Sequence, residues 1–151
     1  MRLEKSNSKN GEENSDKNIL LVDDDADSRA VISLGLKNEG FNVEDNGDPK
    51  DVLAKFKPGK YDLLLLDIHM PGMNGFQLYR EIRKIDKKVR VCFITAFEIY
   101  FDEFRRVFPK IHVSCFVPKP VTLSKLAQVV REALALPPPQ EEVSQPMPKH
   151  D

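Results

Sequence analysis

Chemically active side chains lie at or close to the ends of four short apolar runs of this sequence. Carboxylates near a protein surface repel each other by about 4 kcal/mol at ~4 Å, so a cluster of them calls for a cation. All-oxygen ligands suit a hard divalent ion such as Mg²⁺, and a lysine and a hydroxyl beside it would equip the site to bind a phosphoryl group. The residues concerned are Asp23, Asp24 and Asp25 after the first run, Asp67 after the second, Thr95 after the third and Lys119 near the end of the fourth.

These side chains can act together only if the chain brings the four runs to one edge of the fold. The runs at 19–22, 63–66, 91–94 and 113–117 are continuously apolar, which is typical of strands buried on both faces of a parallel sheet. A weaker, more polar run at 41–43 suits an edge strand.

Helical patterns alternate with the predicted strands. We expect helices over 27–38, 48–56, 75–85, 100–107 and 122–136. In the first of them Ala30, Val31 and Leu34, with Leu36 or Ile32, recur at helical spacing, and in the third Ile85 completes an apolar side. Strict alternation predicts a doubly wound α/β fold with helices on both faces, which carries its chemistry at the carboxyl ends of the strands.

Composition excludes several classes of protein. The 151 residues carry 23 Lys+Arg and 24 Asp+Glu, a net charge of −1, which argues against direct nucleic-acid or membrane-surface binding. No apolar run approaches the ~20 residues of a spanning helix, and the N-terminus lacks the apolar core of a signal peptide. Cys92 and Cys115 show no CxxC spacing, fit a cytoplasmic location and are interpreted as core residues.

Both ends of the chain differ in composition from its middle. Residues 1–17 have one aliphatic side chain after Met1, and 137–151 are rich in proline and charge, so we expect both segments to be disordered. The predicted folded domain is 18–136. No output domain is expected after it, since the tail is too short and too rich in proline to fold into a DNA-binding module.

Each candidate residue has an ordinary structural explanation when it is taken alone. A run of aspartates after a strand is more often a turn and a helix N-cap, and Asp25 or Asp27 suits that role. Aspartate commonly ends strands, and most lysines are solvated. Only the combination, with each strand end supplying a residue type that the chemistry needs, favours a functional site.

The same segments resemble the receiver domain of two-component response regulators, the chemotaxis-type phosphoacceptor fold. The similarity covers about 18–136 and is carried by ILLVDDD (19–25), LLLLDIHMPGMNGF (63–76), CFITAF (92–97) and CFVPKP (115–120), with the D-x-x-M-P-x-M-x-G segment the most specific. It implies a flavodoxin-like sheet of five parallel strands in the order 2-1-3-4-5, and a cis peptide bond before Pro120.

The resemblance also implies roles for the acidic residues. Asp67 would accept a phosphoryl group from a phosphohistidine of a sensor histidine kinase or a histidine phosphotransfer protein. Asp24 and Asp67 would bind Mg²⁺ directly, together with the backbone carbonyl of His69, and Asp23 would hold the water shell of the metal. Because a carboxylate is already ionised at neutral pH, the nucleophile needs no general base.

The remaining roles concern switching and dephosphorylation. Lys119 would pair with the phosphoryl oxygens, Thr95 would hydrogen-bond them, and Phe116 would follow Thr95 inward, unless it is a core residue in both states. His69 and Phe97 occupy positions that modulate dephosphorylation in the family. His69 could equally be a solvated loop residue, whereas a bulky Phe97 is expected to shield the acyl phosphate.

We therefore predict a stand-alone signalling receiver of a phosphorelay, not a true enzyme, that acts by protein–protein contact. The aromatic-rich segment 97–113 would be a partner or homodimer surface, or simply an amphipathic helix packed on the sheet. A pseudo-receiver docking module is the nearest alternative. An aspartyl-phosphate phosphatase would need a second aspartate where His69 stands, and a flavin carrier would need a phosphate loop in place of Asp23–Asp25.

Overall fold

A single parallel sheet forms the centre of the protein. The computed structural model describes residues 17–96, 102, 106 and 116–139. Within them five strands pair in the order β2-β1-β3-β4-β5, and every pairing is parallel. The strands are β1 (Asn18–Val22), β2 (Asn42–Asn46), β3 (Leu63–Asp67), β4 (Arg90–Thr95) and β5 (Phe116–Pro118). The predicted fold class and strand order are confirmed.

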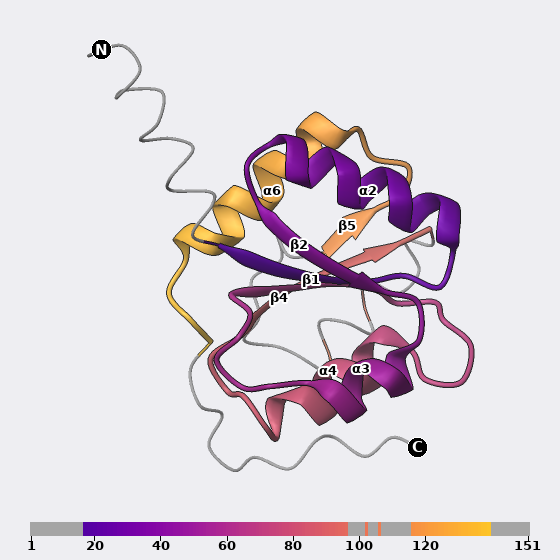
Figure 1. Ribbon diagram of the computed structural model, residues 1–151, viewed down its shortest axis with the longest axis vertical. Coiled ribbons are helices and arrows are strands. Elements are labelled where there is room, and N and C mark those ends of the chain that lie inside the picture. Colours follow the sequence, from indigo (N-terminus) through magenta and orange to yellow (C-terminus); the bar gives the residue numbers. More distant parts are fainter. Residues whose placement is uncertain (1–16, 97–101, 103–105, 107–115, 140–151) are drawn as a thin grey trace.

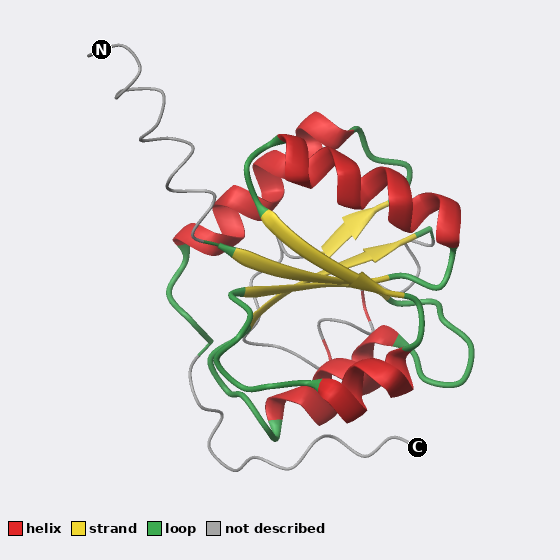
Figure 2. Cartoon of the chain, in the orientation of Figure 1, coloured by secondary structure: helices red, strands yellow, loops and turns green. Residues whose placement is uncertain are grey.

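Helices cover both faces of the sheet. They are α2 (Ala26–Asn38), α3 (Pro49–Lys55), α4 (Gly75–Arg83) and α6 (Leu123–Ala135). Figure 1 shows α2 and α6 together on one face and α3 and α4 on the other, and Figure 2 shows the same three layers by secondary structure. Among the described residues, no helix combines the length and the apolar character needed to cross a membrane.

Two apolar clusters fill the spaces between the sheet and its helices. Along β3, Leu64 and Leu66 belong to the cluster that includes residues of α3 and α4, whereas Leu63 and Leu65 belong to the cluster beside α2 and α6. Because successive side chains of a strand point to opposite faces, a strand in the middle of this sheet must be apolar at every position. This requirement explains the continuous apolar runs.

Helix starts follow the capping residues in the sequence. The Asp25 side chain accepts hydrogen bonds from two main-chain N–H groups at the start of α2, and Thr122 accepts one at the start of α6. Asn74 and Gln77 form a reciprocal capping box at α4. These contacts satisfy N–H groups that a helix leaves without internal partners, and they confirm Asp25 as the cap.

Some boundaries and one helix face differ from the sequence prediction. The edge strand β2 runs from Asn42 to Asn46, not over 41–43, because its backbone pairs with β1 through all five positions although all its side chains but Val43 are polar. Val31 and Leu34 of α2 are 57% and 61% exposed, so the buried face is the alternative one with Ile32 and Leu36.

Helix α4 ends earlier than predicted. It stops at Arg83, and Ile85 lies beyond it with 44% of its surface exposed, so Ile85 was wrongly placed on the buried side. The predicted helix over 100–107 and the first part of the strand predicted over 113–117 lie outside the described residues, apart from 102 and 106.

Phe93 of β4 should be a main determinant of stability. Its ring makes edge-to-face contacts with Phe76 at 5.0 Å and with Tyr79 at 5.8 Å between centroids, and it is fully buried. We expect Phe93→Ala to lower the free energy of unfolding by about 3–5 kcal/mol through the cavity it leaves. Leu34→Ala, on the exposed face of α2, should change it by less than about 0.5 kcal/mol. Urea unfolding followed by circular dichroism measures both, and equal losses would contradict this assignment.

Candidate functional site

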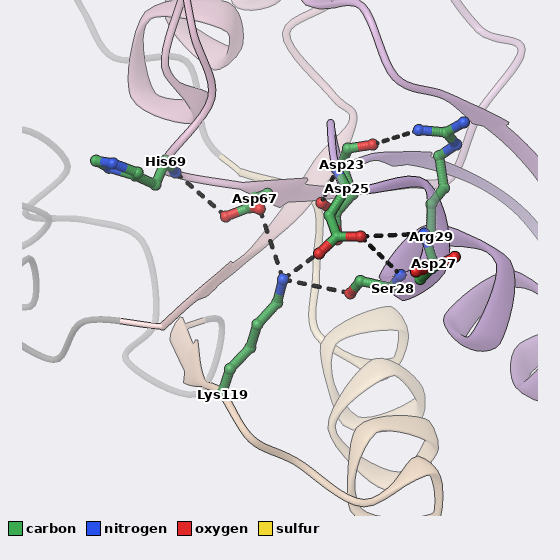
Figure 3. A network of polar contacts seen from close by, with 8 residues as sticks. All are labelled: Asp23, Asp25, Asp27, Ser28, Arg29, Asp67, His69 and Lys119. Atoms are coloured by element: carbon green, nitrogen blue, oxygen red, sulfur yellow. Dashed lines mark hydrogen bonds and ion pairs between the residues drawn. The ribbon is translucent and has the colours of Figure 1, made fainter.

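The carboxyl ends of the strands bring the predicted residues to one edge of the sheet. Asp23 follows β1, Asp67 ends β3, Thr95 ends β4 and Lys119 follows β5. Asp23, Asp67 and Thr95 are buried, although polar residues are rarely found so deep. Figure 3 shows the Lys119 side chain rising from its loop toward both carboxylates.

The ammonium group of Lys119 bridges the acidic residues. Its Nζ lies 3.3 Å from Asp23 Oδ2 and 3.5 Å from Asp67 Oδ2, and it donates a hydrogen bond of 3.4 Å to Ser28 Oγ. The main-chain N–H of Lys119 donates to the Thr95 carbonyl oxygen at 2.6 Å, which ties the lysine loop to the end of β4. The peptide bond between Lys119 and Pro120 is cis, as expected.

Three carboxylates lie close enough together to hold a metal ion. One oxygen each from Asp23, Asp24 and Asp67 lies within 4.8 Å of the others. Asp24 is exposed, whereas the other two are buried. An all-oxygen donor set with one solvent-facing carboxylate fits Mg²⁺, which binds through one or two carboxylates and keeps several waters.

The electrostatics of the cluster also favour a cation. The pKa of Asp67 is raised overall to about 6: burial is the largest cause, the Lys119 ammonium opposes it, and the Asp23 carboxylate adds to the rise. For Lys119, burial lowers the pKa, but the negative charges of Asp67 and Asp23 outweigh burial and raise it overall. One ammonium therefore does not fully offset the cost of ionising Asp67, and a divalent cation would supply the missing positive charge.

The loop after β3 holds Asp67 from its other side. The main-chain N–H of His69 donates to Asp67 Oδ1 at 3.2 Å, while its exposed imidazole ring points away from that carboxylate (Figure 3). The loop then folds back on itself, and Gly75 N–H donates to Ile68 O at 2.9 Å. A Cβ at Gly75 would lie 2.6 Å from the Asp67 carbonyl oxygen, so only glycine allows α4 to start this close to the site.

The predicted switch and dephosphorylation residues are only partly described. Phe116 is buried and pairs in register with Phe93, inside the core cluster on the α3–α4 face. Phe97 and Cys115 lie outside the described residues, whereas Cys92 is buried.

Two site contacts were not predicted from the sequence. Ser28 contacts Lys119, and Arg29 donates a hydrogen bond of 2.7 Å to the Asp23 carbonyl oxygen. Both belong to the first turn of α2, and their only sequence signal was their place just after the acidic run.

A family model described as "Response regulator receiver domain" matches residues 19–131. The chain belongs to this family. The fold agrees, because the non-phosphorylated HemR receiver domain from Leptospira biflexa is 28% identical, with a TM-score of 0.70 over 83% of this chain and 99% of that one. The response regulator TrrA from Thermotoga maritima, solved in complex with Mg(2+)-BeF, is 30% identical, with a TM-score of 0.65 over 78% of this chain and 98% of that one.

Curated relatives of this receiver domain are longer proteins. The uncharacterized transcriptional regulatory protein YkoG of Bacillus subtilis is 31% identical over 116 residues, which are 77% of this chain and 50% of the relative. The DNA-binding response regulator MtrA of Mycobacterium tuberculosis is 38% identical over 78 residues, which are 52% of this chain and 34% of the relative. The chain thus spans half or less of the length of these relatives.

Removing the exposed carboxylate should weaken metal binding by this receiver domain. We expect Asp24→Asn to lower Mg²⁺ affinity by at least about tenfold in isothermal titration calorimetry, because a neutral amide replaces one of the clustered charges. Asp27→Asn is the matched control, since Asp27 is also exposed, three residues further on in the first turn of α2, but is not part of the three-carboxylate cluster. Similar affinities for both variants would count against the metal assignment.

Asp67→Asn should stabilise the metal-free protein. Because the folded-state pKa of Asp67 is about 6 against an ordinary 3.8, and one pKa unit corresponds to about 1.4 kcal/mol, ionising this carboxyl at neutral pH costs the folded state about 3 kcal/mol, which an amide avoids. The gain should be complete above pH 6 and should shrink toward pH 4, where wild-type Asp67 is protonated when folded. Thermal unfolding in EDTA across this pH range tests it, and a destabilised variant at pH 7.5 would contradict it.

Proposed function

We propose that this receiver domain is a Mg²⁺-dependent phosphoacceptor whose nucleophile is Asp67. The phosphodonor would be a phosphohistidine on a sensor histidine kinase or a histidine phosphotransfer protein. The observation that carries the proposal is the Lys119 ammonium, which lies within 3.5 Å of carboxylate oxygens of both Asp23 and Asp67 beside a third carboxylate.

In the proposed step, an Asp67 carboxylate oxygen attacks phosphorus. The new oxygen–phosphorus bond forms as the phosphorus–nitrogen bond of the donor breaks, and the departing imidazole keeps the electron pair and takes a proton. Repulsion between the anionic nucleophile and the anionic phosphoryl group is the main obstacle, and Lys119 reduces it from one side. Mg²⁺, held by Asp24, Asp67 and the His69 carbonyl with Asp23 on its water shell, would neutralise phosphoryl oxygens.

The proposed output is a change in protein surface. Thr95 would hydrogen-bond the phosphoryl oxygens, and Phe116 would repack in response, so that a downstream protein or a second copy of the chain binds the altered face. His69 and Phe97 would set the access of water to the acyl phosphate. No direct contact with nucleic acid is proposed for the receiver domain itself, although MtrA is named a DNA-binding regulator. That the receiver acts alone stays a prediction.

The nearest competing function is a docking module that is never phosphorylated. The two proposals differ in one measurable property, which is covalent modification. The intact acidic cluster and Lys119 favour the phosphoacceptor, because a docking module has no need to bury like charges at a cost in stability.

Incubation with acetyl phosphate and Mg²⁺, followed by intact mass spectrometry, tests the proposal. We expect the mass of one phosphoryl group to be added to the wild type. The addition should be absent in EDTA and in Asp67→Asn, and it should persist in the exposed control Asp27→Asn. No addition to a wild type that binds Mg²⁺ would leave the docking module as the better explanation.

A further inference from the structure

The guanidinium of Arg29 contacts the main chain of the acidic segment. Its Nη1 donates a 2.7 Å hydrogen bond to the carbonyl oxygen of Asp23, as Figure 3 shows, and its Nε lies 3.7 Å from Asp45 Oδ1 on β2. One side chain from the first turn of α2 thus connects the end of β1 with the neighbouring edge strand.

Gly47 leaves the space that this guanidinium occupies. A Cβ at Gly47 would lie 2.4 Å from Arg29 Nη1 and 3.1 Å from its Cζ, whereas the next nearest atom, Asp23 O, would be at an ordinary 3.5 Å. The backbone of Gly47 does not have the positive φ found at Gly40, Gly59 and Gly72. The position of Arg29, and not backbone conformation, therefore accounts for a glycine here.

The contact from Arg29 to the Asp23 carbonyl also orients the backbone at Asp24. The Asp23 carbonyl belongs to the planar peptide unit that leads into Asp24, so holding its oxygen orients the start of Asp24. The other polar groups of Asp23 are also held: its N–H donates to Asn46 O, Oδ1 accepts from Asp25 N–H, and Oδ2 pairs with Lys119.

We propose that Arg29 is a positioning residue that holds Asp23 and Asp24 in the arrangement that binds the divalent cation, with Gly47 keeping its place open. This inference rests on the proposed metal-dependent function. Arginine suits the task because its rigid fork can contact a carbonyl and a carboxylate at once, which a single ammonium does less well.

A double-mutant cycle on the full chain tests the inference, with Mg²⁺ affinity from isothermal titration calorimetry. Arg29→Ala removes the contact, and Gly47→Ala displaces the guanidinium at little cost in stability, because the clash falls on the mobile end of a side chain. We expect each to weaken Mg²⁺ binding about tenfold, as loss of an outer-shell partner commonly does. The double variant should bind no more weakly than Arg29→Ala, because the new methyl group then has nothing to displace.

Two further variants distinguish the geometry of the Arg29 contact from its positive charge and from a general loss of protein stability. Arg29→Lys keeps the positive charge, so weakened Mg²⁺ binding in this variant shows that geometry matters. Gly59→Ala is the control, since Gly59 has a positive φ and no neighbour within 4 Å, and it should lose stability but keep Mg²⁺ affinity. In EDTA, the Asp25 amide should exchange with solvent faster in Gly47→Ala, because the Asp23 side chain that accepts its hydrogen bond is less firmly held.

The outcomes distinguish this inference from the proposed function. Wild-type Mg²⁺ affinity in Arg29→Ala and Gly47→Ala overturns the positioning role. So does a double variant in which the two losses of Mg²⁺ affinity multiply, because Gly47 would then act through its own backbone. A wild type that binds Mg²⁺ but takes no phosphoryl group refutes the phosphoacceptor alone, and the cycle still decides the role of Arg29. A wild type that binds no Mg²⁺ overturns both.

Discussion

Two buried carboxylates share one ammonium at the carboxyl edge of the sheet, and the rest of the structure serves to keep them there. Asp23 follows β1 and Asp67 ends the neighbouring strand β3, while Lys119 follows β5 at the far edge of the sheet. Only a parallel sheet presents all these strand ends on the same side, and each parallel connection needs a crossover. The three-layer architecture is thus required to form the cluster of charges. Without it, burying two carboxylates so close together would be unfavourable.

The fold and the central site could be predicted because both depend on local patterns. Apolar runs such as LLLL before Asp67 mark strands buried on both faces, and caps such as Thr122 mark helix starts. The alternation of strands and helices predicts the topology. In such sheets functional residues lie at the carboxyl ends of the strands, and this places Asp23, Asp67, Thr95 and Lys119 at one site. These residues are found in the expected place because the parallel pairing puts the carboxyl ends of their strands at the same edge of the sheet.

Other features depend on contacts that no local pattern reveals. The stripe through Val31 and Leu34 has helical spacing, yet α2 buries Ile32 and Leu36 instead, because its rotation is set by packing against the sheet and α6. The contacts of Arg29 could not be predicted from the sequence for the same reason, because its partners lie at the end of β1 and on β2. The need for a glycine at position 47 likewise becomes clear only from the guanidinium beside it.

The unfavourable electrostatics of the site have a consequence for signalling. Asp67 is held ionised against burial and against Asp23, so its environment already opposes negative charge before any phosphoryl group arrives. A phosphoryl group would place more negative charge farther from the Asp67 backbone, and we expect the Lys119 ammonium to follow it. The main-chain N–H of Lys119 donates a hydrogen bond to Thr95 O, so such a movement would act on the ends of β4 and β5. Phe116 of β5 packs in the core there. Electrostatic repulsion at Asp67 would thereby change the packing at the edge of the sheet. In this way a small covalent change can alter a binding surface.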